Sequence, residues 1–76
     1  MDVDTKEMDR LEALAEQSYT AMYDARRPKD GYEDACLNFQ RAIDEAHRIG
    51  LEDEAARLTR RLDHVRAVYR SQFRGF

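Results

Sequence analysis

Two histidines and one cysteine are the side chains of this 76-residue chain best suited to metal binding or nucleophilic catalysis. If Gly50 forms a turn between two helices, His47 and His64 lie about 16 Å apart along that pair and cannot share a metal ion. Asp44 and His47 share one helical face, as in the metal sites of helical bundles, but such sites need further carboxylates from other helices. We therefore predict a surface Asp–His pair and no metal site.

Cys36 falls on the apolar face of the second expected helix, where a free cysteine usually behaves as a small hydrophobic residue. A nucleophilic cysteine needs an activating base or a helix N-terminus, but Cys36 lies in the second turn, too deep for much help from the helix dipole, and has no histidine near it. A single cysteine also excludes an intrachain disulfide and a cysteine-rich zinc site. The chain has no glycine-rich phosphate loop and no serine in a nucleophile motif. We expect no enzyme activity and no cofactor.

Basic side chains lie along the third expected helix, on the side opposite its apolar residues. They are Arg57, Arg60, His64 and Arg74. Such a stripe can bind a phosphate backbone or another anion, which defines an alternative function as a small regulator. The sequence pI of 5.3 and a possible Asp53–Arg57 pair at i, i+4 favour a solvated face instead. We therefore do not expect nucleic acid to be the partner.

The charges are segregated along the chain, although the net charge is only −3. Residues 1–25 carry seven acidic and two basic side chains, whereas residues 57–76 carry six arginines and one aspartate. In an antiparallel bundle the first and third helices lie side by side, and opposite charges then attract modestly at the surface. The segregation predicts ion pairs between these two helices.

The elements that would position these residues are three helices, at about 5–26, 31–49 and 51–73. Asp4 and Glu7 form a capping-box pattern that begins the first helix, and Asp30 with Glu33 forms a second one. Residues 26–31 include Pro28 and are predicted to be a loop. Gly50 suits the left-handed position after a helix end, so the third helix follows almost at once.

Each predicted helix has one apolar face. The first carries Met8, Leu11, Leu14, Ala15, Ser18, Tyr19, Met22 and Ala25; the second Tyr32, Ala35, Cys36, Phe39, Ala42, Ile43, Ala46 and Ile49; the third Leu51, Ala55, Leu58, Leu62, Val65, Tyr69 and Gln72. No stretch has the alternation of a strand. The helices match in length and need only short connections. The fold prediction is all-α, a single domain over residues 1–76 built as an antiparallel three-helix up-down-up bundle.

Residues 32–43 of the second expected helix resemble the second helix of a tetratricopeptide (TPR) repeat. The match consists of Tyr32-Glu33-Asp34-Ala35, then Phe39, then Ala42-Ile43, a small-x3-aromatic-x2-small spacing. The resemblance implies that Ala35 and Ala42 let two helices approach closely and that Phe39 fills the groove between repeats. It also implies a TPR-like helical hairpin, and the family uses such hairpins to bind peptides.

Some apolar side chains fall outside the tightest core arcs, and a chain this small has few ways to cover them. These are Tyr23, Leu37, Val68 and Phe76. Together they predict a surface for a protein partner or a second copy, so the leading hypothesis is a non-enzymatic interaction module that self-associates as a homodimer. The acidic first residues, with no apolar run after them, indicate a cytoplasmic protein without a signal peptide or membrane span.

Overall fold

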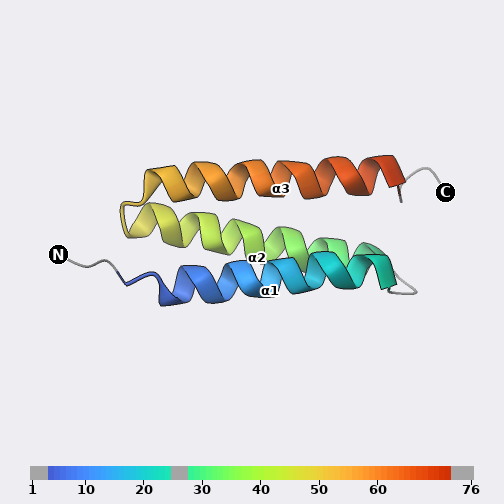
Figure 1. Ribbon diagram of the computed structural model, residues 1–76, viewed down its shortest axis with the longest axis horizontal. Coiled ribbons are helices and arrows are strands. Elements are labelled where there is room, and N and C mark those ends of the chain that lie inside the picture. The colour runs from blue at the N-terminus through green and yellow to red at the C-terminus, as the bar shows by residue number, and fades with distance from the viewer. Residues whose placement is uncertain (1–3, 25–27, 73–76) are drawn as a thin grey trace.

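The computed structural model contains three α-helices joined in an up-down-up order (Figure 1). Helix α1 spans Lys6–Asp24, α2 spans Pro28–Arg48 and α3 spans Glu52–Gln72. The structure describes residues 4–24 and 28–72, and no strand occurs among them. The predicted all-α three-helix bundle is therefore confirmed. The predicted ends agree to within one or two residues wherever they fall on described residues, with one exception at the start of α2.

The start of α1 follows the predicted cap. A carboxylate oxygen of Asp4 accepts a hydrogen bond of 2.9 Å from the backbone amide of Lys6. This bond satisfies one of the amide groups that a helix leaves unpaired at its N-terminus. The reciprocal half of the capping box is absent here, because the Glu7 carboxylate instead pairs with Arg10.

The start of α2 corrects the prediction of a loop over residues 26–31. The helix already begins at Pro28, so Asp30 lies in its first turn and does not cap it. Proline is well suited to the first helical position, because its fixed φ matches the helix and the amide it lacks would be unpaired there. Gly31, also predicted to be in the loop, lies inside the helix where α2 crosses α1.

The turn between α2 and α3 is a Schellman motif, as Gly50 predicted. Gly50 has a φ of +81°, the left-handed conformation that glycine adopts without strain. The amide of Leu51 donates to the carbonyl of Ala46 at 2.8 Å, and the amide of Gly50 donates to that of His47 at 3.1 Å. These two bonds satisfy carbonyls at the end of α2 and let α3 begin immediately.

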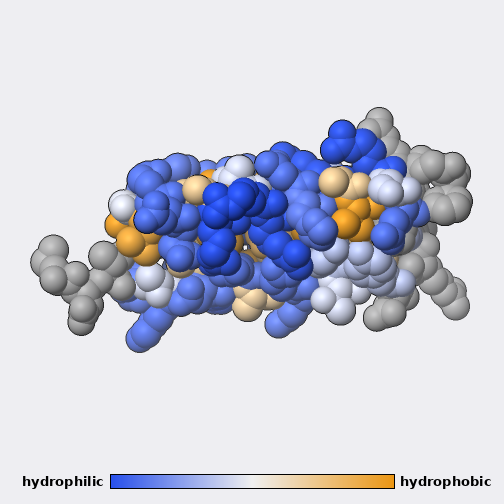
Figure 2. All heavy atoms as spheres, turned by 45° about the horizontal axis from the view of Figure 1, so that its top comes forward, coloured by the Kyte–Doolittle hydropathy of each residue, from blue (hydrophilic) through white to orange (hydrophobic). Residues whose placement is uncertain are grey.

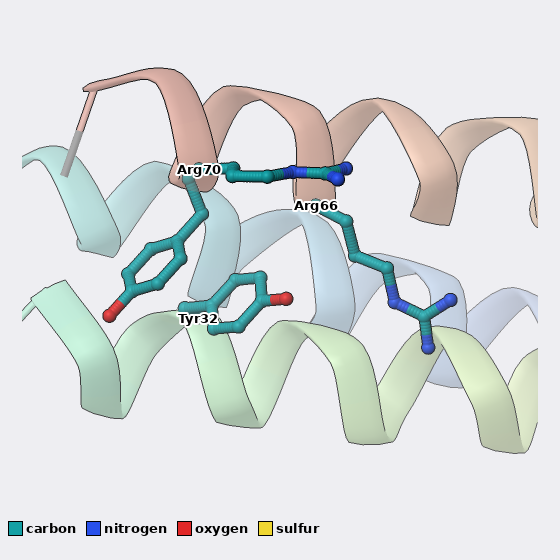
Figure 3. Close-up of a pocket in the computed structure, with 4 residues that line it drawn as sticks. Tyr32, Arg66 and Arg70 are labelled. Carbon is teal, nitrogen blue, oxygen red and sulfur yellow. The ribbon is translucent and has the colours of Figure 1, made fainter. Parts of the chain in front are cut away.

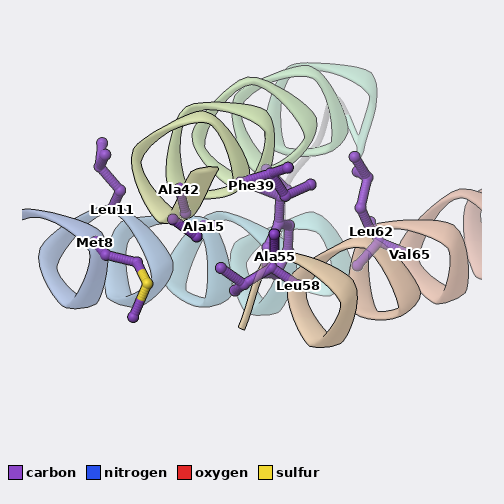
Figure 4. Close-up of a cluster of buried hydrophobic side chains, with 12 residues drawn as sticks. Met8, Leu11, Ala15, Phe39, Ala42, Ala55, Leu58, Leu62 and Val65 are labelled. Carbon is purple, nitrogen blue, oxygen red and sulfur yellow. The ribbon is translucent and has the colours of Figure 1, made fainter. Parts of the chain in front are cut away.

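The core runs along the inner faces of all three helices (Figure 4). Phe39, Met22, Leu58 and Val65 are its largest fully buried side chains. Most of the predicted core positions are buried or half-buried, including Ala35 and Ala42. Leu14 was predicted to be in the core but is 37% exposed. It lies at the edge of the arc of α1, and two neighbouring helices are too few to cover that edge.

Helix α2 packs against both of its neighbours, whereas the backbones of α1 and α3 approach each other much less closely. The result is an elongated molecule measuring 49 × 17 × 12 Å. Hydrophilic side chains predominate on the face in Figure 2, and hydrophobic ones are visible as small separate patches. Over the described residues, no helix combines the length and the apolar character needed to cross a bilayer.

Candidate functional site

Ion pairs link α1 to α3 along a line that we call the α1–α3 seam. Arg57 donates two hydrogen bonds of 2.8 Å to Glu12, and Arg61 donates bonds of 2.8 and 2.9 Å to Glu16. Each arginine thus binds a carboxylate in a bidentate manner, through two hydrogen bonds, which is the strongest geometry for such a pair. The predicted attraction between the acidic first segment and the basic last segment is confirmed in these two pairs.

The ion pairs of the seam also shift the pKa values of the groups that form them. Hydrogen bonds from Arg57 lower the pKa of Glu12 below its usual value, although burial opposes the shift. The hydrogen bonds that Arg57 donates to Glu12 and to Glu54 raise the pKa of Arg57. The predicted Asp53–Arg57 pair is wrong, because Arg57 instead binds Glu54 on its own helix at 2.7 Å. Arg57 is therefore held between two carboxylates.

Towards the C-terminal end of α1 the seam becomes aromatic. The guanidinium of Arg61 lies 5.0 Å from the centre of the Tyr19 ring, and His64 meets that ring edge-on with centroids 6.4 Å apart. The Tyr19 hydroxyl lies 3.0 Å from the hydroxyl of Tyr23. Burial first, and this neighbour second, raise the pKa of Tyr19. The imidazole of His64 is thus part of the packing between α1 and α3.

The predicted interaction surface does not form one patch. Tyr23 is 49% exposed on the side of α1 that faces α3. Each seam pair joins residues 45 positions apart in the sequence, so the half-buried Val68 lies opposite Tyr23 along the two helices. Leu37 is 48% exposed, but it lies 200° around α2 from the buried Ala35 and so faces away from both neighbours. Phe76 lies outside the described residues.

The predicted arginine stripe is also divided. Arg57 and His64 belong to the α1–α3 seam and contact α1. Arg60 is exposed on α3 and makes no ion pair with any described residue. Arg74 lies outside the described residues. Only Arg60, among the stripe members that the structure describes, keeps its charge free for an external anion.

The two histidines and the cysteine are placed apart. His47 pairs across the turn with Glu52, at 2.7 Å from Nδ1, whereas Asp44 accepts a hydrogen bond from Gln40. The predicted Asp44–His47 surface pair is therefore wrong, because the sharp turn at Gly50 brings Glu52 within reach of the imidazole. Cys36 is half-buried against the core, as predicted. Within the described part of the chain, no three His, Cys, Asp or Glu side chains lie close enough together to hold a metal ion.

The most distinctive surface feature lies where the start of α2 meets the end of α3 (Figure 3). The rings of Tyr32 and Tyr69 stack in parallel, with centroids 3.9 Å apart and an angle of 9° between their planes. Beside them, Arg66 and Arg70 line a hollow of about 350 Å³. We call this hollow, with its four lining residues, the tyrosine–arginine notch.

The charge of the notch is poorly neutralised. Arg70 makes no ion pair with any described residue, and Arg66 has only Asp63, at 3.9 Å with both side chains about half exposed or more. Figure 3 shows both guanidinium groups extending past the same end of the Tyr32 ring. Burial raises the pKa of the Tyr32 hydroxyl, and Cys36 beside it acts in the same direction while Arg66 opposes it. The Tyr32 hydroxyl therefore stays protonated and neutral at neutral pH.

The other large hollow with arginines differs in this respect. It lies between α1 and α2 and includes Arg10, Arg41 and Arg48. Arg10 is paired with Glu7 and Arg48 with Glu45, whereas Arg41 makes no ion pair with any described residue. Three carboxylates, those of Glu7, Asp44 and Glu45, line this hollow together with the arginines. The tyrosine–arginine notch differs because no described carboxylate lines it, and neither of its arginines is bound to a carboxylate through two hydrogen bonds.

The notch was missed from the sequence, although a signal for it was present. Tyr32 lies eighteen residues before Gly50 and Tyr69 nineteen after it, so an antiparallel hairpin around Gly50 places both rings at the same level. Arg66 and Arg70 flank Tyr69 at one helical turn's spacing or less. The apolar periodicity predicts both tyrosines to be core residues, whereas the structure leaves them half-buried.

Comparison of the chain with protein-family models, with curated proteins and with solved structures finds no match.

Proposed function

We propose that this chain is a non-enzymatic helical module that binds another protein, and that the tyrosine–arginine notch is its docking site. The observation that supports this most strongly is the pair of stacked tyrosines in one hollow with Arg66 and Arg70. Neither arginine is bound to a described carboxylate through two hydrogen bonds. Tyrosine and arginine are, with tryptophan, the residues that most often dominate the energy of protein interfaces.

The packing of the notch supports the same proposal. Two rings held against each other by α2 and α3 lose little conformational freedom when a partner covers them, because they are already ordered. The expected partner surface of Tyr23, Leu37, Val68 and Phe76 has less support, since Leu37 lies on another face from Tyr23. The TPR-like resemblance remains part of the proposal as a second reason to expect a peptide ligand.

The alternative function, anion or nucleic-acid binding through the stripe of Arg57, Arg60, His64 and Arg74, has weaker support. An anion at Arg57 would compete with Glu12 and Glu54, which already bind that guanidinium. We also propose that the module self-associates as a homodimer, and the experiment below measures this on the same samples.

The test is affinity enrichment with the immobilised chain, followed by quantitative mass spectrometry, for three forms. These are the wild type, the notch variant Arg70→Glu and the matched control Arg60→Glu, which reverses an exposed charge elsewhere on α3. We expect proteins that the wild type and Arg60→Glu retain and that Arg70→Glu loses. Equal retention by Arg70→Glu would refute the docking site. Sedimentation velocity on the same samples shows whether the retained protein is a second copy.

A further inference from the structure

We infer that the tyrosine–arginine notch recognises an acidic peptide segment, with a carboxylate at Arg66 and Arg70 and a neighbouring apolar side chain on the tyrosine rings. This inference rests on the proposed function and specifies its ligand. The hollow is large enough for one or two side chains but far too small for a folded domain to enter.

The charge balance of the arginines indicates a carboxylate. Arg57 and Arg61 each hold a glutamate through two hydrogen bonds of 2.8–2.9 Å, whereas Arg66 is 3.9 Å from its nearest carboxylate and Arg70 has no ion pair with any described residue. A guanidinium presents a planar fork of donors that matches a carboxylate. Two such forks on the same side of Tyr32 leave donors for one or two external carboxylates (Figure 3).

The rings supply the second part of the recognition. Tyr32 and Tyr69 are half-buried and parallel, so each still offers apolar surface to a ligand. The two rings and the two arginines line the same hollow. A ligand that combines a negative charge with an adjacent aromatic or aliphatic group can therefore use both at once, whereas an inorganic anion can use only the arginines.

The surroundings favour a peptide over nucleic acid. Asp30, Glu33 and Asp34 are exposed on the same turns of α2 as Tyr32, and Asp63 is exposed next to Arg66. A nucleic-acid site gains its affinity by neutralising a series of phosphates with an extended basic surface. Here the positive charge is confined to two arginines, which is enough for one or two carboxylates but not for a series of phosphates.

The experiment is a titration of the ¹⁵N-labelled chain, followed by NMR, with defined probes. The main probe is a short blocked peptide of three glutamates around one phenylalanine, and its matched control has glutamines in place of the glutamates. Inorganic phosphate and a 12-nucleotide single-stranded DNA test the other anions. The protein forms are the wild type, Arg66→Gln with Arg70→Gln, and the control Arg60→Gln, each first checked for a folded spectrum.

We expect the acidic peptide to shift the signals of Tyr32, Arg66, Tyr69 and Arg70, and to bind about tenfold more tightly than the glutamine peptide. The double notch variant should lose about tenfold in affinity or more, and Arg60→Gln should match the wild type within about twofold.

The inference would be overturned if the notch signals did not move at about 5 mM acidic peptide, a concentration that would detect even weak binding. Equal affinity for the glutamine peptide, tighter binding of the DNA, or the same shifts with phosphate alone would overturn it too. Notch-dependent capture of a partner that has no such acidic segment would contradict this inference but leave the proposed function standing.

Discussion

Replacing Gly31 by alanine should destabilise the protein, although alanine is the better helix former. Gly31 lies in the first turns of α2, where that helix crosses α1. A Cβ atom at this position would lie 3.0 Å from Cα of Met22, 3.0 Å from the carbonyl oxygen of Ser18 and 3.1 Å from the amide nitrogen of Met22. All three are backbone atoms, so no side chain can turn away to relieve the contact.

The two helices would have to separate by several tenths of an ångström to restore ordinary contacts of 3.4 Å or more. Overpacking of this kind costs about 1–3 kcal/mol. The higher helix propensity of alanine returns at most about 1 kcal/mol. We therefore expect Gly31→Ala to lower the free energy of unfolding by about 1–2 kcal/mol, equivalent to a fall in melting temperature of about 5–15 °C for a domain of this size.

The assay is thermal and urea unfolding followed by circular dichroism at 222 nm. The matched control is Thr20→Ala on the exposed side of α1, which gains helix propensity without a close neighbour and should leave the melting temperature unchanged or slightly higher. A Gly31→Ala protein as stable as the wild type, or more stable, would refute the close approach of α1 and α2 at this position.

Three further predictions concern the core, the seam and the outer face of α2. Phe39→Ala should cost about 3–5 kcal/mol, which is comparable to the whole stability expected of so small a core, so the variant should be unfolded by circular dichroism at room temperature; a cooperative melt near that of the wild type would contradict the central position of Phe39. Because the pKa of Glu12 is lowered by Arg57, its ionised form contributes stability at pH values above its unfolded-state pKa, and this contribution is lost as the pH falls through the lowered value. The stability advantage of the wild type over Glu12→Gln, about 1 kcal/mol at most because both partners reach solvent, should therefore shrink between about pH 6 and pH 3 in urea titrations, and a constant difference would refute the pair. Leu37→Glu should change the free energy of unfolding by less than about 0.5 kcal/mol, since the side chain is 48% exposed on the outer face of α2, and a larger loss would show that something covers it.

The features that could be predicted from the sequence are those set by local chemistry. The cap at Asp4 and the Schellman turn at Gly50 depend on a few adjacent residues, so their patterns were sufficient. The periodic apolar faces likewise predicted most of the core, and the segregated charges predicted pairs such as Glu12–Arg57. The cap, the turn and the apolar faces need no knowledge of how the helices pack, whereas the ion pairs also required the first and third helices to lie side by side.

The errors arose where helix packing decided the outcome. Pro28 and Gly31 are typical loop residues, but here one begins α2 and the other allows its close contact with α1. Leu14 falls within the apolar arc of α1, yet no neighbour covers that edge. His47 turned to Glu52 because the turn at Gly50 is tight.

The notch could not be assembled from periodicity alone, for the same reason. Tyr32 and Tyr69 have core spacing on their own helices, and only the register of the α2–α3 hairpin shows that they stack at its surface. Arg66 and Arg70 are candidates for ligand binding because no described carboxylate binds them through two hydrogen bonds, as Glu12 binds Arg57 and Glu16 binds Arg61.

The docking site exists only if α2 and α3 hold those two rings together. Nuclear Overhauser effects between the ring protons of Tyr32 and Tyr69 measure this directly in the free protein. With ring centroids 3.9 Å apart, we predict strong cross-peaks between the two rings and ring resonances displaced from their random-coil positions. Absent cross-peaks together with random-coil ring shifts, in a chain that is otherwise folded, would contradict the notch and the binding proposed for it.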